Sequence, residues 1–152
     1  MTADRDALMR VALDEARAAL VHDDVPIGAV VARRDTGEVI ARRHNERELS
    51  NDPTAHAEVL ALRDAAEALG TWRLDGCVLV VTLEPCPMCA GAALAARVPE
   101  VVFGAADPKA GAMGSLYSFG ADPRLNHSVH VVDGVDAEES AALLTEFFSK
   151  RR

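Results

Sequence analysis

The segment CVLVVTLEPCPMC, residues 77–89, decides the fold class of this chain. Residues 77–83 are β-branched or apolar on both alternating faces, which is typical of a strand buried on both sides of a sheet. Pro85 ends this strand, and the small, alanine-rich residues 87–97 predict a helix packed closely on its neighbours. A doubly buried strand followed by a helix indicates an α/β protein with a covered sheet.

Apolar spacing on either side of this segment predicts the other elements. Amphipathic helices are expected over residues 4–22, 55–69 and 136–149, the second of them with Asp52 as its cap, Pro53 in its first turn and Gly70 as its stop. Strands are expected over residues 27–32, 38–42, 101–103 and 128–132, and the first two are joined by turn residues 35–37.

This order of elements predicts one domain. No repeat, low-complexity run or Pro/Ser-rich linker divides the sequence, so residues 1–152 are expected to form a single unit. Strands and helices alternate from residue 52 onward, which indicates a largely parallel sheet covered by helices. Residues 107–120 predict a long loop without a clear period, and loops of this length are often functional.

Composition and charge exclude several classes of protein. The chain has 16 Lys and Arg against 24 Asp and Glu, a net charge of −8, and is 49% hydrophobic, which excludes a disordered chain. We expect no membrane span and no signal peptide, and therefore a cytoplasmic location. Three cysteines argue against a disulfide framework. The acidic balance argues against a general nucleic-acid binder but permits local basic groups, such as Arg42, Arg43, Arg47 and residues 150–152.

Two short motifs carry the chemistry. The first contains His56 and Glu58, and the second contains Cys86 and Cys89. A Cys-x-x-Cys pair can be a metal site, a redox pair or a coincidence, but a histidine at another predicted helix start favours metal. One His and two Cys give three ligands to zinc and leave a fourth position open, which is the pattern of catalytic rather than structural sites. Glu58 is then better placed as a general base and acid than as a ligand.

The chain resembles the bacterial tRNA-specific adenosine deaminases. His-x-Glu with Pro-Cys-x-x-Cys is the signature of zinc-dependent nucleobase deaminases, and the likeness extends from about residue 8 to residue 152. The matching stretches are DVPIGAV (residues 24–30), HN (44–45), DPTAHAE (52–58), TLEPC (82–86), VFGA (102–105), GSL (114–116), LNH (125–127) and AALL (141–144).

The resemblance implies a three-layer α/β/α, cytidine-deaminase-like fold with a central mixed five-stranded sheet. It implies a homodimer that converts adenosine to inosine at the wobble position of a tRNA anticodon, with one Zn²⁺ per subunit held by His56, Cys86 and Cys89 and with Glu58 transferring protons. It also implies substrate contacts from Asn45 to the base edge, Pro26 and Ile27 in the pocket wall, Asp107, Lys109 and Asn126 near the target nucleotide, and Phe148 with residues 150–152 at the anticodon loop.

Two other functions remain open at this point. A deaminase of a free base or nucleoside, of the guanine or cytosine type, would carry the same zinc motif on the same fold. A zinc-stabilised module that binds RNA or a partner without chemistry would keep the ligands but would not need Glu58.

Overall fold

The computed structural model describes residues 3–151. Its helices and strands follow the expected order with two additions, a short helix and short 3-10 turns. The elements are α1 (Arg5–Ala19), η1 (Leu20–His22), β1 (Gly28–Arg33), β2 (Val39–His44), α2 (Arg47–Ser50), α3 (Ala57–Leu69), β3 (Cys77–Leu83), α4 (Pro87–Ala95), β4 (Glu100–Ala105), η2 (Phe119–Ala121), β5 (His130–Val132) and α5 (Ala137–Ser149).

The five strands form one mixed sheet in the order β2-β1-β3-β4-β5. The hairpin strands β1 and β2 pair antiparallel, and β1 pairs antiparallel with β3. The strands that follow helices, β3, β4 and β5, pair parallel with one another. The expectation of a mixed five-stranded sheet is therefore confirmed, but the sheet is parallel only among β3, β4 and β5 and is not largely parallel as a whole.

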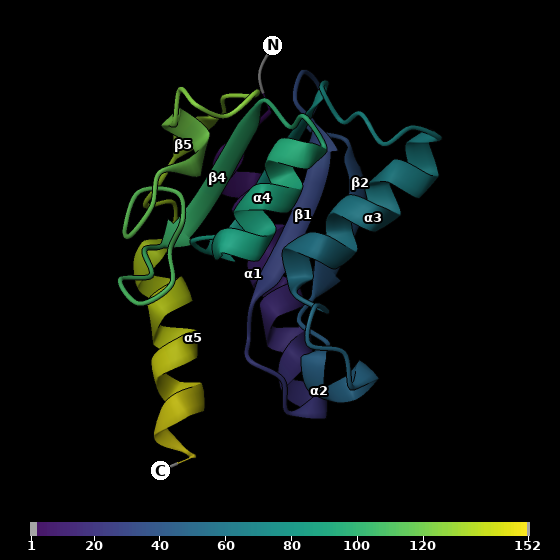
Figure 1. The fold of residues 1–152 in the computed structure, drawn as a ribbon. Helices are drawn as coiled ribbons and strands as arrows, with labels where there is room; N and C mark the ends of the chain where they lie inside the picture. The colour runs from purple at the N-terminus through teal and green to yellow at the C-terminus, as the bar shows by residue number, and fades with distance from the viewer. Residues whose placement is uncertain (1–2, 152) are drawn as a thin grey trace.

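Helices cover both faces of the sheet, which gives three layers (Figure 1). Alternate residues of each strand enter different clusters because successive side chains point to opposite faces. Val30, Val80 and Val102 pack against α1 and Leu143 of α5. Val31, Leu79, Val81 and Val101 pack with the buried residues of α3 and α4 on the other face. The three-layer α/β/α architecture is confirmed, and β3 is buried along nearly its whole length.

One predicted helix start is wrong. The helix expected to begin at Asp52-Pro53 begins at Ala57, with His56 as the residue before it. The Asp52 carboxylate instead accepts hydrogen bonds from the backbone N–H and hydroxyl of Thr54, which holds a turn. Asp and Pro favour turns as much as helix starts, so the local pattern could not separate the two. The later start places His56 itself at the junction of loop and helix.

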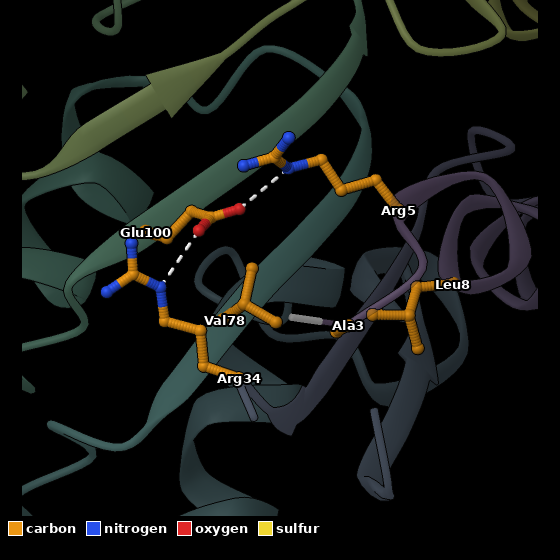
Figure 2. Close-up of a pocket in the computed structure, with 6 residues that line it drawn as sticks. All are labelled: Ala3, Arg5, Leu8, Arg34, Val78 and Glu100. Atoms are coloured by element: carbon orange, nitrogen blue, oxygen red, sulfur yellow. Dashed lines mark hydrogen bonds and ion pairs between the residues drawn. The ribbon is translucent and has the colours of Figure 1, made fainter. Parts of the chain in front are cut away.

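The two edges of the sheet differ in character. At the amino ends of β3 and β4, Figure 2 shows a small depression in which Glu100 bridges Arg5 and Arg34 at 2.9 Å each. The carboxyl ends of the same strands lead to Cys86 and to the long loop after Ala105. No helix within residues 3–151 is both long and apolar enough to cross a membrane.

Candidate metal centre and active site

His56, Cys86 and Cys89 meet at the carboxyl edge of the sheet. His56 is the residue before α3, Cys86 is the residue before α4, and Cys89 lies in the first turn of α4 behind Pro87. The Nδ1 atom of His56 lies 3.7 Å from Sγ of Cys86 and 3.5 Å from Sγ of Cys89. Among the described residues this is the one group of three or more side chains able to hold a metal ion.

These distances fit a tetrahedral zinc site. With Zn–S of about 2.3 Å and Zn–N of about 2.05 Å, tetrahedral ligands are separated by about 3.6 Å from nitrogen to sulfur. The observed separations of 3.7 and 3.5 Å match this value, and all three donor atoms lie within 4.8 Å of one another. The donor set therefore fits a zinc ion bound through Nδ1 of His56.

The electrostatics of the two sulfurs also favour a cation. Hydrogen bonding from Cys89, helped by His56 and opposed by burial, lowers the pKa of the Cys86 thiol to about 4. The neighbouring Cys86 sulfur, together with burial, raises the pKa of the Cys89 thiol. Two adjacent sulfurs cannot both become thiolates unless a positive charge lies between them, because like charges in a poorly solvated site repel. A divalent cation removes this conflict.

Glu58 lies in the first turn of α3, two residues after the ligand His56. Its side chain is fully buried, and burial raises the pKa of its carboxyl group to about 7. Hydrogen bonding with Cys89 and the charge of His56 act on the same carboxyl group, so it belongs to this cluster. A carboxyl group whose pKa lies near neutrality can both accept and donate a proton, which is what general acid–base catalysis requires.

Strand register brings further predicted residues to this edge. Because β1 is antiparallel to β3, the start of β1 lies at the same edge as the end of β3, and Gly28 pairs with His44 at the end of β2. Pro26, Ile27 and Asn45 therefore lie at the same edge of the sheet as the metal ligands. Asn45 is buried, and its Oδ1 accepts the backbone N–H of Arg47 at 3.4 Å, which leaves the amide NH₂ group available to a ligand.

The loop after β4 is organised by Glu84, a residue that the sequence analysis did not single out. The buried Glu84 carboxylate accepts the backbone N–H groups of Asp107, Met113 and Ser115 at 3.0 Å each, and also the Ser115 hydroxyl. Burial opposes its ionisation, but these hydrogen bonds lower the pKa of Glu84 below its ordinary value. Its position directly before Pro85 and Cys86, at the end of a strand, was the available signal.

The remaining predicted contacts differ in position. Asp107 lies at this edge, but its Oδ1 accepts the backbone N–H groups of Lys109 and Ala110, so it holds its own turn; the Lys109 side chain is exposed. Phe148 is exposed on α5, which extends past the sheet on the same side as α2 (Figure 1). Arg151 binds Asp23, which confirms that the end of α5 approaches this side.

Asn126 is not brought to this edge within one chain. Its neighbour His127 bonds the backbone carbonyl of Val98 at 2.8 Å, at the amino end of β4. Within one chain, the loop that carries Asn126 therefore lies at the opposite edge of the sheet from His56, Cys86 and Cys89, because a loop leading into a parallel strand runs at the opposite edge from the loop leaving it. A role of Asn126 near the target nucleotide stays a prediction.

Part of the expected basic surface is neutralised. Arg42 binds Glu15 at 2.8 Å, and Arg43 binds Asp64 and Glu46. Arg47 remains exposed, Lys150 pairs with Glu146 on the surface of α5, and residue 152 lies outside the described residues.

Comparisons with known proteins agree with this geometry. The family model for MafB19-like deaminases matches residues 3–152. The chain is 50% identical to the tRNA-specific adenosine deaminase of Bacillus subtilis (strain 168), over 100% of this chain and 92% of that protein. The chain belongs to the tRNA-specific adenosine deaminase family.

Solved structures place this deaminase among two kinds of relative. A structure from a study of A-to-I editing by tRNA:A34 deaminases has a TM-score of 0.86 at 48% identity, covering 91% of this chain and 99% of that one. A guanine deaminase from Nitrosomonas europaea has a TM-score of 0.82 at 31% identity, covering 97% and 86%. The fold is thus shared by both substrate classes, and sequence identity favours the first.

Proposed function

We propose that this protein hydrolyses the adenine amino group of a tRNA wobble adenosine and so forms inosine. The observation that carries the proposal is the convergence of the His56 imidazole on two sulfurs with a buried carboxyl group, Glu58, beside them. This arrangement supplies what hydrolytic deamination of a base needs, and the 50% identity to a tRNA-specific adenosine deaminase supports the substrate.

His56, Cys86 and Cys89 would hold one Zn²⁺, which when bound lowers the pKa of water toward neutrality and so supplies a nucleophile. Glu58 accepts the proton of the attacking water and delivers it to N1 as the hydroxyl group adds at C6. Glu58 then takes the proton of that C6 hydroxyl group and passes it to the departing amine. Ammonia leaves and the C6 carbonyl of inosine forms. The pKa of about 7 at Glu58 is suited to carrying a proton in both directions.

Residues at the rim would hold the flipped base and its RNA. The Asn45 amide donates to an acceptor on the base edge, and Pro26 and Ile27 form the apolar wall. Lys109 and the end of α5, with Phe148 and Lys150, are exposed on the side where an anticodon loop would approach. Asp107 positions the loop that carries Lys109. We also propose a homodimer, which light scattering of the purified protein tests.

Deamination of guanine is the second candidate, favoured by the likeness to a guanine deaminase at a TM-score of 0.82. The test is to incubate the zinc-loaded protein with an anticodon stem-loop that carries adenosine at the wobble position, and separately with adenosine, guanine and cytosine. We expect inosine in the RNA only. Turnover restricted to a free compound would refute the proposal, and no turnover of any substrate would favour the binding module.

Removal of the metal gives a second test of the same site. Treatment with a chelator is expected to abolish inosine formation, and one equivalent of Zn²⁺ is expected to restore it. A His130→Gln variant, altered at an exposed histidine far from the ligands in sequence, is the control and should bind the same amount of zinc.

A further inference from the structure

Two histidines to which the proposed reaction gives no role face each other beside α1, at the end of β2. His22 of η1 and His44 at the end of β2 stack with ring centroids 5.1 Å apart, and their Nε2 atoms are 3.0 Å apart. The other ring nitrogen of each is bound to a carboxylate: Nδ1 of His22 to Asp24 at 2.6 Å, and Nδ1 of His44 to Glu15 at 2.9 Å. All four side chains are half-buried or buried.

The hydrogen bonds around this cluster decide where the protons lie. Asp24 already accepts the backbone N–H groups of Glu48 and Leu49 at 2.7 and 3.1 Å, and Glu15 accepts Arg42 at 2.8 Å. Both carboxyl groups have a lowered pKa despite burial, so they are acceptors only. Each Nδ1 must therefore be the donor, and in two neutral rings both Nε2 atoms present lone pairs to each other.

We propose that His22 and His44 form a second metal site, for a borderline divalent ion such as Ni²⁺, Cu²⁺ or Zn²⁺, bound through the two Nε2 atoms. Two imidazole nitrogens at about 2.1 Å from an ion and at 90° to each other are about 3.0 Å apart, as in octahedral or square-planar sites. The observed Nε2 separation is 3.0 Å. This geometry differs from the tetrahedral triad at His56, and water completes the coordination.

Two further features of the cluster support a cation. A carboxylate bound to the far nitrogen of each ring is the arrangement that orients metal-ligating histidines and fixes their tautomer. The charged groups that face the pair are Glu15 from α1, Asp24 from the segment after η1 and Arg42 from β2, which together carry a net charge of −1 when no imidazole is protonated. A bound ion therefore enters a negative, preorganised site.

The position of the pair gives the site a structural consequence. His44 precedes Asn45, and Asp24 accepts the N–H groups of Glu48 and Leu49 in α2. An ion shared by His22 and His44 would fix η1 to the end of β2, and so stiffen the wall that carries Asn45. The ion is separate from the catalytic metal, and its binding does not depend on the identity of the substrate.

The experiment is calorimetric titration of the zinc-loaded protein with Ni²⁺, with zinc content measured before and after. We expect one equivalent of Ni²⁺ to bind without displacing zinc, and the affinity to fall at least tenfold in His22→Gln and in His44→Gln. His130→Gln removes an exposed histidine of β5 and is the matched control, which should bind as the parent protein does.

A measurement on the parent protein guards against variants that fail to fold. Titration with additional Zn²⁺, followed by ¹⁵N imidazole NMR, should shift the Nε2 resonances of His22 and His44 together and leave those of His130 unchanged. The proposal is overturned if no equivalent beyond the catalytic zinc binds, if the bound equivalent persists in both histidine variants, or if the two Nε2 resonances do not respond.

Discussion

The two edges of this sheet both bury glutamates, but they treat them differently. At the amino edge, Glu100 lies between the guanidinium groups of Arg5 and Arg34, and although burial opposes it, this pairing lowers the pKa of Glu100. At the carboxyl edge, Glu84 is held ionised by backbone N–H groups, whereas burial raises the pKa of Glu58 to about 7. At the amino edge, two arginines compensate the charge of Glu100. At the carboxyl edge, the Glu58 carboxyl group remains able to exchange a proton near neutral pH.

This difference shows that buried glutamates of the same sheet serve different purposes, structural for some and catalytic for another. Glu100 and Glu84 each satisfy their oxygens and fix neighbouring chain segments, so each is expected to contribute to stability or position. Glu58 is desolvated beside a metal-ligand set, so its carboxyl group is available to the reaction. Substitution of each glutamate by glutamine tests this division, since the shape is kept while the charge is removed.

The largest effect is expected for Glu58→Gln. Glutamine cannot accept and return a proton, so inosine formation in an anticodon stem-loop should fall by about 10²–10⁴-fold. Zinc content, measured by elemental analysis, should remain that of the parent protein because Glu58 is not a ligand. Loss of the metal together with activity would show that its assignment as a proton carrier is wrong.

A smaller loss is expected for Glu84→Gln. The NH₂ group of the new glutamine would face backbone N–H groups of the 107–115 loop, which now donate hydrogen bonds to the Glu84 carboxylate. Two donors that face each other form no hydrogen bond. We expect kcat/KM to fall by about tenfold to a hundredfold, with unfolding destabilised by about 1–3 kcal/mol. Kinetics on the stem-loop and denaturant unfolding measure the two effects. An unchanged KM and kcat would mean that the loop needs no anchor at Glu84.

Gly111→Ala tests the same anchor from the loop side. An added Cβ would lie 2.3 Å from Cδ of Glu84, so the loop or the carboxylate must move. Activity is expected to fall several-fold, by less than in Glu84→Gln. The matched control is Gly91→Ala in α4, where an added Cβ meets nothing within 4 Å and should stabilise the helix by about 0.5–1 kcal/mol. Equal activities of both variants would contradict the close contact.

The smallest effect on activity is expected for Glu100→Gln, which should leave deamination unchanged. Its arginine partners are about two-fifths exposed, at 42% and 43%, so solvent screening reduces the loss of stability to about 1–2 kcal/mol.

The lowered pKa of Glu100 determines how its contribution to stability depends on pH. The unfolded carboxyl group binds a proton more readily than the folded one, so the contribution of Glu100 is present above its ordinary pKa of 4.5 and is lost as the pH falls through the folded pKa. Denaturant unfolding of both proteins between pH 3 and 7 should therefore show a difference that shrinks toward acid. A constant difference would contradict the ion-pair explanation.

The sequence predicted most of the fold because the signals were local. The doubly buried β3, the hairpin of β1 and β2 and the amphipathic α1 and α5 each follow from spacing within a few residues. The start of α3 and the short α2 were missed, since Asp52-Pro53 is compatible with a turn and a four-residue helix has little pattern. Glu84 was missed because its three partner residues, Asp107, Met113 and Ser115, lie more than twenty positions further along the chain.

By itself, the sequence determined the chemical types at the site: one imidazole and two thiols for a metal, and a carboxyl group two positions after the imidazole. The order of these residues along the chain, together with the matching stretches of sequence, identified the family. Only the tertiary structure decided that Nδ1 of His56 faces both sulfurs, that Asn126 lies at the other edge, and that His22 meets His44. The physical reason is that strand register and helix packing set distances between residues that the chain separates, and local composition contains no measure of those distances.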